Sequence, residues 1–571
     1  PDSDLDGVLD GVDPYPSVPA GRRYANISGS LGPAPWDNAG DLNTIFVEVD
    51  QANSNGDPTD DISEIWVSSG VYMSPFLVGL VIPSGNVAIL GGFHVGDTKV
   101  GQRDPDPLTN GCQIVRTSIE NYRYLAGTPA GTLDGFALTN GFSSGLGLTQ
   151  ITHWRGIMTL RNLLIANYAN NNGSPYSAVQ TIESSATLVM EDCILVNNLS
   201  KQNGGAVHDR GVNSVYRRCE FSSNQSTPTL DNFTTGYKGG GAFFGSFEGQ
   251  YTSYGDRPTF IDCQFLYNLV SSGTLPQLGE IAGTRGGGAA CIDDQGAIFE
   301  RCDFVGNAAI SKKPDSNNLY TTNHFWGTDN HADDGGAIFM RDGSTLGEGG
   351  LLSITNCRFF GNAAGRGSAI AVETPSWYSG LSVINCSFAG NFGLMDGIGG
   401  LISSTHNNPS YPGAGAAENW PLMSHGQEMH NSVSAGNYAA GLPPSAVLTE
   451  EQVFLANALT MTLEVQYGTH GLTTKIEYSV IEMPTSLGPA WTNIKYDSIL
   501  HGQLFQKASV GNLRLAGESV AIDFGNNFVD TDTTLIGLQP LSPYDLDGNP
   551  RVVNGDGIGG AQVDAGAYEV Q

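Results

Sequence analysis

Short alternations of apolar and polar residues recur along the chain in a fixed order. Five copies share the pattern Cys-x-Phe-x-x-Asn and begin at Cys219, Cys263, Cys302, Cys357 and Cys386. A cysteine and a phenylalanine two positions apart have the period of a β-strand with one buried face. Weaker copies begin at Cys193 and Ser432 or occur as "LRNLLIANY", "LDGFALTNG" and "IEYSVIE", which gives about ten units.

A second apolar element follows the asparagine in most units. It is Gly-Gly-Ala plus an apolar residue at Gly204, Gly240, Gly287 and Gly335, and "GSAI" at Gly367. This element predicts a second short strand that the chain enters through a turn. Such a unit cannot bury its apolar face alone, so the units are expected to stack in parallel as an all-β solenoid. A leucine-rich horseshoe is disfavoured, because the chain shows no Leu-x-x-Leu-x-Leu pattern.

Stacking would place equivalent residues of successive units above one another. We expect the phenylalanine and the cysteine to lie inside and the small Gly and Ala residues to pass tight corners. We expect the asparagine to adopt a left-handed conformation while its amide bonds to the asparagine of the next unit.

The composition fits an ordered, turn-rich protein with an acidic surface. The 571 residues include 76 glycines, and 40% of the residues are hydrophobic, which suffices for a continuous core. Lys and Arg total 26 against 57 Asp and Glu, a formal charge of −31 that disfavours nucleic acid and anionic membranes as partners. The sequence contains no apolar run of about 18 residues, so membrane insertion is not expected.

The repeats resemble those of right-handed parallel β-helix proteins of the bacterial cell surface, in particular proteins with polymorphic-outer-membrane-protein-like repeats. The C-terminal "SVAIDFG", "DLDGNPRVV" and "VDAGAYE" are similar to the closing segment of large secreted bacterial proteins. The resemblance implies a secreted or cell-surface right-handed parallel β-helix with capping segments and long loop insertions. It implies an N-terminal strap (1–20), a cap with the first coils (21–130), the repeats (131–482) and a C-terminal capping segment (483–571).

The N-terminal "DSDLDGVLDGVD" has the spacing of a calcium-binding loop. The expected ligands are Asp2, Asp4, Asp6, Val8 and Asp13. Hard cations such as calcium need a cage of oxygen atoms, and these positions would supply it. The stretch also resembles a thrombospondin type 3 calcium repeat. The alternative is an acidic, flexible N-terminus without a bound ion.

Two further stretches combine residues that could bind a metal ion or a sugar. The insertion between Asn307 and Gly335 contains His324, Trp326, Asp329, His331, Asp333 and Asp334. Aromatic rings stack on sugars and His and Asp ligate metals, but a long surface loop is the simpler explanation. Near the C-terminus lie Asp545, Asp547, Asn554 and Asp556, for which turn formation is the better explanation.

A column of polar residues follows the repeat alanine at a distance of four positions. It consists of Arg210, Ser246, Asp293, Arg341 and Glu373. Charged residues on adjacent coils could form the groove of a lyase, in which a basic residue removes a proton. They could equally form a solvated ladder of surface ion pairs. The Gly-His-Gly and Arg-x-Lys signatures of polygalacturonase-type hydrolases are absent.

Four roles are open to the repeated cysteine. A ladder supplies one thiol per coil, which does not converge on a metal ion, and parallel Cβ vectors suit a disulfide poorly. Catalysis needs an activated thiolate with a histidine nearby, which only the unit with His208 offers. Replacement by Leu163 and Ser432 in weaker copies favours packing.

These patterns predict an extracellular structural or adhesive protein that assembles through loops on a rigid scaffold, as a filament or a surface layer. The expected partners are further copies of the chain or cell-surface glycans. The alternative functions on the same fold are a carbohydrate-active enzyme, such as a polysaccharide lyase or glycoside hydrolase, and a glycan-binding module without turnover.

Overall fold

The fold was analysed in a computed structural model. The structure describes residues 21–27, 36, 39–57, 60–73, 80–83, 85–115, 119–121, 130–139, 142–143, 151–170, 177–201, 203–227, 239–246, 257–271, 286–293, 296–310, 335–341, 350–365, 367–374, 380–393, 401–407, 427–430, 432–434, 437, 459–464, 474–477, 479–482, 495–497, 505–507, 510–517, 519–525, 527, 543–553 and 561–570.

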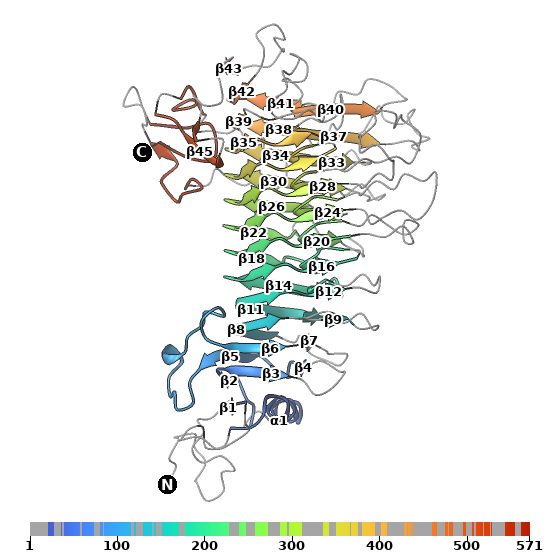
Figure 1. The fold of residues 1–571 in the computed structure, drawn as a ribbon, viewed down its shortest axis with the longest axis vertical. Coiled ribbons are helices and arrows are strands. Elements are labelled where there is room, and N and C mark those ends of the chain that lie inside the picture. The colour runs from blue at the N-terminus through green and yellow to red at the C-terminus, as the bar shows by residue number, and fades with distance from the viewer. Residues whose placement is uncertain are drawn as a thin grey trace, which may run out of the picture. The chain divides into compact units, whose positions relative to one another are not determined.

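The chain forms a right-handed parallel β-helix, as the repeats predicted. It divides into two compact units. Unit 1 comprises residues 1–201 and 206–220, and unit 2 comprises residues 202–205 and 221–571. Within each unit, strands from successive coils pair in parallel and form columns (Figure 1). The side chains that point into the coil form the core of each unit.

Four columns of strands build unit 1. The first column contains β4 (Leu80–Val81), β7 (Ile119–Asn121), β10 (Ile151–His153), β13 (Val179–Thr181) and β17 (Val207–Asp209). The second and third columns contain β1 (Arg22–Ala25), β2 (Glu64–Ser68), β3 (Gly70–Met73), β5 (Val87–Phe93), β6 (Cys112–Val115), β8 (Ala130–Thr139), β11 (Gly156–Ala166), β14 (Ala186–Glu191), β15 (Ile194–Val196) and β18 (Val215–Arg217). The fourth column contains β9 (Phe142–Ser143), β12 (Ala169–Asn170) and β16 (Leu199–Ser200), and the short 3-10 helix η2 covers Val100–Gln102.

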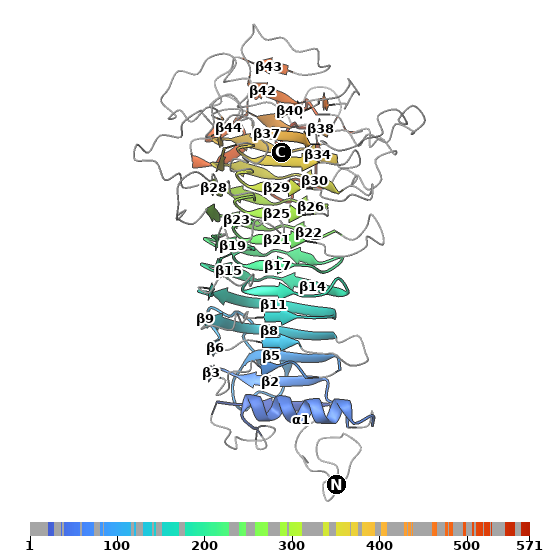
Figure 2. The ribbon, with the colours of Figure 1, turned by 90° about the vertical axis from the view of Figure 1, so that its right-hand side faces the viewer.

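Helix α1 (Leu42–Ser54) lies across the N-terminal end of unit 1 (Figure 2). Asp41 caps it by accepting hydrogen bonds from the backbone N–H groups of Asn43 and Thr44, both at 3.1 Å. One face of the helix is buried through Leu42, Ile45, Phe46 and Val49. The helix therefore covers the end of the stack, where backbone groups and apolar side chains would otherwise face solvent.

Unit 2 repeats the four columns with shorter strands. The first column contains β21 (Phe243–Ser246), β25 (Ala290–Asp293), β29 (Ile338–Arg341), β33 (Ile370–Thr374), β37 (Ile402–Asn407) and β40 (Leu459–Glu464). The second contains β22 (Thr259–Ile261), β26 (Ala297–Glu300), β30 (Leu351–Thr355), β34 (Gly380–Ile384), β38 (Gln427–His430) and β41 (Thr474–Glu477). The third contains β23 (Gln264–Leu266), β27 (Asp303–Val305), β31 (Arg358–Phe360), β35 (Ser387–Ala389), β39 (Val433–Ser434), β42 (Val480–Glu482) and β43 (Lys495–Asp497). The fourth contains β20 (Gln225–Ser226), β24 (Leu269–Ser271), β28 (Ala308–Ile310), β32 (Ala363–Ala364) and β36 (Phe392–Gly393), while β19 (Glu220–Ser222) holds the boundary between the units.

Two sharp corners in each coil connect the strands. The first corner separates the second and third columns, and its left-handed residues in unit 2 are Asp262, Arg301, Asn356 and Asn385. The second corner separates the third and fourth columns, and its left-handed residues there are Ser223, Tyr267, Gly306, Gly361 and Gly390. In each repeat, one left-handed residue thus lies just before the cysteine and another lies just before the asparagine. The prediction that the asparagine itself is left-handed is wrong. The residue before it has the positive φ, and the asparagine side chain is buried inside the coil.

The phenylalanines of the repeat form a continuous stack inside unit 2. Ring centroids lie 4.8 Å apart between Phe221 and Phe265 and 4.9 Å apart between Phe265 and Phe304. The stack continues at 4.7 Å to Phe359 and 4.8 Å to Phe388, with nearly parallel ring planes. This spacing equals the distance between parallel strands, so the rings follow the backbone repeat.

Glycine is required at the turn that enters the first column. Gly240 has a φ of +81°, and a Cβ atom there would lie 1.8 Å from the carbonyl oxygen of Phe243. A Cβ atom on the following Gly241 would lie 2.0 Å from the carbonyl oxygen of Gly288 in the next coil. The Gly-Gly-Ala element therefore exists because neighbouring backbones approach too closely for a side chain.

The C-terminal residues of unit 2 fold against the side of its coils. Two antiparallel pairs, β44 (Phe505–Lys507) with β45 (Asn512–Leu515) and β46 (Val552–Val553) with β47 (Gln562–Val563), occur in the described part of residues 505–570, which we name the closing segment. Its core contains Phe505, Leu513, Leu515 and Tyr568 and includes Ala389 of β35. The closing segment is therefore packed on the outer face of the third column.

Candidate functional site

The repeated cysteine lies inside the first corner and makes hydrogen bonds there. The Cys302 thiol donates to the carbonyl oxygen of Glu300 at 3.4 Å, and the Cys302 backbone N–H donates to the sulfur of Cys357 at 3.4 Å. Each sulfur can thus accept the corner N–H of the preceding coil, which the turn leaves without a strand partner. The cysteine is a connector between coils as well as a packed side chain.

Serine replaces the cysteine in this role at the last coils. The Cys386 N–H donates to Oγ of Ser432 at 3.1 Å, and the Ser432 N–H donates to Oγ of Ser479 at 3.2 Å. All eight cysteines are buried thiols, and burial raises the pKa of Cys302 and of Cys357 well above the usual value. The thiols of Cys302 and Cys357 therefore stay protonated at neutral pH, and a protonated thiol is not a nucleophile.

The asparagines form a hydrogen-bonded ladder at the second corner. Oδ1 of Asn307 accepts hydrogen bonds from both the backbone N–H (3.0 Å) and the Nδ2 group (2.9 Å) of Asn268. Asn307 in turn donates from N and Nδ2 to Oδ1 of Asn362, both at 3.0 Å, and from Nδ2 to the Phe265 carbonyl oxygen at 2.9 Å. The amide ladder predicted from the sequence is confirmed. The amide is used fully within the coils, so it does not serve an external ligand.

The predicted polar column lies on the outer face of the first column in unit 2. Ser246, Asp293, Arg341 and Glu373 are successive register neighbours. The carboxylate of Asp293 lies 3.8 Å from Nη1 of Arg341, and their side chains are 14% and 23% exposed. In unit 1, Arg210 donates from Nε to Nε2 of His208 at 3.4 Å. The structure thus brings together the four unit 2 residues of this column, of which Asp293 and Arg341 form an ion pair.

An apolar column runs beside these charges on the same face. It contains Phe244, Cys291, Phe339 and Ala371, all of which are buried. Burial raises the pKa of the Cys291 thiol well above its usual value. Chemically, the Asp293 carboxylate next to a guanidinium could bind sugar hydroxyls or move a proton, but the neighbouring rings are not open to a stacked sugar.

A buried carboxylate in unit 1 escaped the sequence analysis. Asp209 accepts hydrogen bonds from Thr181 Oγ1 (2.7 Å), the Tyr216 hydroxyl (2.8 Å) and the Gly211 N–H (2.9 Å). Burial raises the pKa of Asp209, and these donors oppose that rise. The cluster fixes the turn between the first and second columns. Gly211 and Tyr216 belong to the same coil as Asp209, whereas Thr181 lies 28 positions earlier in the preceding coil, so the repeat pattern did not predict the cluster.

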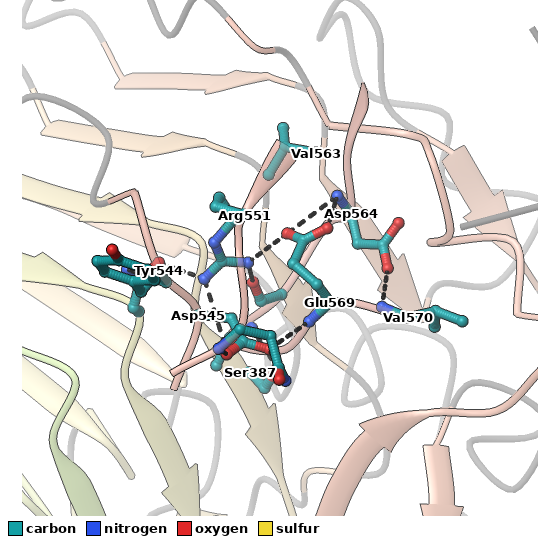
Figure 3. Close-up of polar contacts among 12 residues, drawn as sticks. Ser387, Tyr544, Asp545, Arg551, Val563, Asp564, Glu569 and Val570 are labelled. Atoms are coloured by element: carbon teal, nitrogen blue, oxygen red, sulfur yellow. Dashed lines mark hydrogen bonds and ion pairs between the residues drawn. The ribbon is translucent and has the colours of Figure 1, made fainter. Parts of the chain in front are cut away.

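Arg551 is the centre of a second buried polar cluster, which we name the Arg551 network (Figure 3). Its Nη1 donates to Glu569 at 2.7 Å and to the Gly566 carbonyl oxygen at 2.9 Å, and its Nη2 donates to Oδ1 of Asn356. The Arg551 and Glu569 side chains are 1% and 0% exposed. The network therefore joins the closing segment to the first corner of a coil through a fully desolvated guanidinium.

Two further carboxylates belong to the Arg551 network. Asp564 accepts hydrogen bonds from the N–H groups of Asp523 (2.6 Å) and Val570 (2.7 Å). Asp545 accepts from the Asn549 N–H at 2.7 Å and from the Glu569 N–H at 2.9 Å, and it closes a turn as the sequence indicated. The network thus contains three carboxylates, of which Glu569 pairs directly with the guanidinium.

Burial opposes the ionisation of Glu569 and Asp564. Desolvation raises the pKa of Glu569 to about 8, although Arg551 lowers it in part. Desolvation likewise raises the pKa of Asp564 to about 6, against the hydrogen bonds from Asp523 and Val570. Within the Arg551 network the folded state consequently holds protons more tightly than the unfolded chain does.

The closing segment forms hydrogen bonds with coil residues whose equivalents in earlier coils are of other residue types. Nδ2 of Asn356 donates to the Tyr544 carbonyl oxygen at 2.9 Å, Nη1 of Arg358 donates to the Gly511 carbonyl oxygen at 2.8 Å, and the Ala567 N–H donates to Oγ of Ser387 at 3.0 Å. At the uncovered corner the equivalent residues Asp262 and Arg301 form an ion pair at 2.7 Å. A neutral asparagine thus replaces a charged residue where the closing segment covers the corner.

The metal-binding predictions fall largely outside the described residues. The calcium-loop residues Asp2, Asp4, Asp6, Val8 and Asp13 lie there, and so does the insertion with His324 and Trp326. Asp547 is described and forms an ion pair with Arg514 at 2.6 Å. In the part of the chain that the structure describes, no three His, Cys, Asp or Glu side chains gather as they would around a metal ion.

Comparisons with known proteins give no family for this chain. No protein-family profile and no curated protein matches the sequence. A solved structure, the crystal structure of pectate lyase Pel9A, aligns over 96% of each chain with a TM-score of 0.34 and 9% sequence identity. A likeness of this size transfers no residue role or activity. Among the described residues, no helix combines the length and apolar character that crossing a membrane requires.

Proposed function

We propose that this chain is an extracellular structural or adhesive protein, a rigid scaffold that presents its surface to further copies of itself or to cell-surface glycans. The observation that carries the proposal is that the repeated residues all make contacts inside the coils. Cysteine, phenylalanine, asparagine and glycine of each unit all connect one coil to the next. The repeated sequence therefore encodes mechanical continuity, as in other solenoids with extended binding surfaces.

The ends of the stack suggest how copies would associate. Helix α1 covers the N-terminal end of unit 1 with its apolar face turned inward. A covered end does not template strand pairing with another copy, so lateral contacts are favoured over end-to-end stacking. Secretion to a bacterial cell surface and a calcium ion at Asp2, Asp4, Asp6, Val8 and Asp13 belong to the same proposal.

Measurement of the assembly state tests this proposal directly. The full chain is examined by light scattering and negative-stain microscopy with calcium and with a chelator. We expect lateral assemblies or surface arrays that depend on concentration, and stoichiometric calcium in the native protein. Monomers under all conditions, together with failure to bind any glycan or cell surface, would refute the proposal.

A second candidate function is that of a carbohydrate-active enzyme. The partly buried ion pair of Asp293 and Arg341 on the outer face of the first column favours it. Incubation with a polysaccharide panel, followed by absorbance of unsaturated uronates and release of reducing ends, detects lyase and hydrolase activity. Loss of any such activity in Asp293→Asn with unchanged thermal stability would assign it to this pair, whereas an inactive wild type removes this candidate.

A further inference from the structure

Tyr267 is unusual for its position at the second corner of unit 2. It has a φ of +55°, in the left-handed region that bulky residues rarely adopt. Ser223 precedes it in the same position and Gly306, Gly361 and Gly390 follow it, and these small residues suit such a corner. A tyrosine in this conformation strains the backbone while most of the residue stays exposed, and strain of this kind clusters at functional positions.

The ring of Tyr267 is presented to solvent and held from behind. The residue is 65% exposed, and it is the one exposed large hydrophobic residue on the described strands and corners of unit 2 outside the closing segment. A Cβ atom on Gly306 would lie 2.5 Å from Cδ1 of the ring, so the ring lies directly against the backbone of the next coil. The absence of a side chain at Gly306 is what allows this position.

The surface beside Tyr267 is open where the equivalent surface of later coils is covered. The outer face of the third column carries Gln264 and Leu266 on β23, of which Gln264 is exposed and Leu266 half-buried. On β35 the equivalent residues Ser387 and Ala389 are buried beneath the closing segment. A platform composed of the Tyr267 ring, Leu266 and the Gln264 amide therefore remains uncovered.

The covered part of the same face shows what an aromatic ring here can hold. A Cβ atom on Gly511 of the closing segment would lie 2.9 Å from Cδ1 of Phe360, so a flat backbone turn packs on that ring. Tyr267 offers the same kind of flat apolar surface without an occupant from the described residues of this chain. Its hydroxyl and the nearby Gln264 amide add hydrogen-bonding groups, which a sugar ring can use and a glycine turn cannot.

Charge limits the class of sugar. Asp262 and Asp303 border the platform, and each is paired with an arginine, Arg301 and Arg358 respectively. The chain as a whole carries a formal charge of −31, which repels uronate-rich polymers. A neutral glycan therefore fits this surface better than an anionic one.

We propose that Tyr267, with Leu266 and Gln264, forms a binding platform for a neutral sugar ring of a cell-surface or extracellular glycan. The aromatic ring stacks on the apolar face of the sugar, and Gln264 bonds its hydroxyl groups. This inference rests on the adhesive function proposed above and adds the class of ligand and its position. It concerns binding alone and requires no chemical step.

Binding of the full chain to polysaccharides tests the platform. The probes are xylan, galactomannan and cellulose as neutral polymers and polygalacturonate as the anionic counterpart, measured by affinity electrophoresis and pull-down. We expect Tyr267→Asn to weaken binding of a neutral polymer about tenfold, as the loss of one aromatic stacking contact does. Asparagine occupies the same corner in other coils, as at Asn197, so the thermal unfolding temperature should stay within about 2 °C.

Two variants complete the test. Tyr267→Phe keeps the ring and should retain binding within about threefold. Ile157→Ser removes another exposed apolar side chain, on β11 of unit 1, and should leave binding unchanged.

Three outcomes would overturn the platform. If the wild type binds no neutral polymer, the platform proposal is wrong. The scaffold proposal is then decided separately by the measurement of the assembly state. If Tyr267→Asn binds as the wild type does, glycan adhesion lies elsewhere on the chain. If Tyr267→Asn changes self-association and leaves glycan binding unaltered, the ring contacts a second copy of the chain.

Discussion

The coil interior and the closing segment of unit 2 are stabilised in opposite ways. Inside the coils, neutral side chains repeat the same contact from coil to coil, as the ladder through Asn268, Asn307 and Asn362 does. In the closing segment, one guanidinium at Arg551 satisfies several partners that occur once. A ladder distributes stability over many equivalent contacts, whereas the Arg551 network concentrates it in one residue.

Removal of the guanidinium is expected to have the largest effect. Arg551→Ala would leave the Glu569 carboxyl, the Gly566 carbonyl oxygen and Oδ1 of Asn356 buried without their donor, which costs about 3 to 5 kcal/mol in the free energy of unfolding. Urea unfolding followed by circular dichroism measures the loss. Hydrogen exchange should localise it to the closing segment.

An exposed arginine of the same segment is the matched control. Arg514 pairs with Asp547, but its side chain is 45% exposed. Arg514→Ala should cost below about 1 kcal/mol, as exposed ion pairs do. Equal losses in the two variants would contradict the contrast between a concentrated network and a distributed ladder.

A break in the ladder should cost less than the loss of Arg551. Asn307→Ala would remove the acceptor of two Asn268 donors and the Nδ2 group that donates to Asn362 and to the Phe265 carbonyl oxygen, and the groups left behind would be buried. We expect a loss of about 2 to 3 kcal/mol in unfolding free energy. Asn307→Asp keeps the acceptor oxygens but loses the amide donors, so its loss should differ from that of alanine, whereas identical losses would show that packing alone matters.

The Arg551 network should also respond to pH in a way that the neutral ladder does not. Glu569 has a folded pKa of about 8, above the ordinary value of 4.5. Its contribution to stability is fully present below about pH 4.5 and is lost as the pH rises through about 8. Unfolding free energies at pH 5 and pH 9 measure this loss.

Glu569→Gln removes the titrating group and is expected to reduce the decline between pH 5 and pH 9 by on the order of 1 to 2 kcal/mol. Glutamine keeps an acceptor for Arg551, so the network can persist. A wild type that gains stability above pH 8 would contradict the sign.

The interior was predictable from the sequence because the same contacts recur in every copy of the sequence repeat. The amide ladder and the phenylalanine stack follow from a period that the cysteines and asparagines display. The Arg551 network was not predictable, since Asn356 and Arg551 lie 195 positions apart and occur once. The left-handed backbone of Tyr267 was not predictable either, because the corner imposes this conformation and tyrosine has no preference for it.

The smallest effect is expected for the repeated cysteine. In Cys357→Ser, the hydroxyl would replace a thiol that accepts the Cys302 N–H at 3.4 Å and donates to the Thr355 carbonyl oxygen at 3.3 Å. Ser432 and Ser479 already serve as acceptors in the same column, so the loss should stay below about 1 kcal/mol. Cys357→Asp would bury a charge without a partner and should lower the free energy of unfolding far more than the serine variant does. Retained stability in the aspartate variant would show that the corner is hydrated, and the cysteine column would then no longer be part of the dry interior.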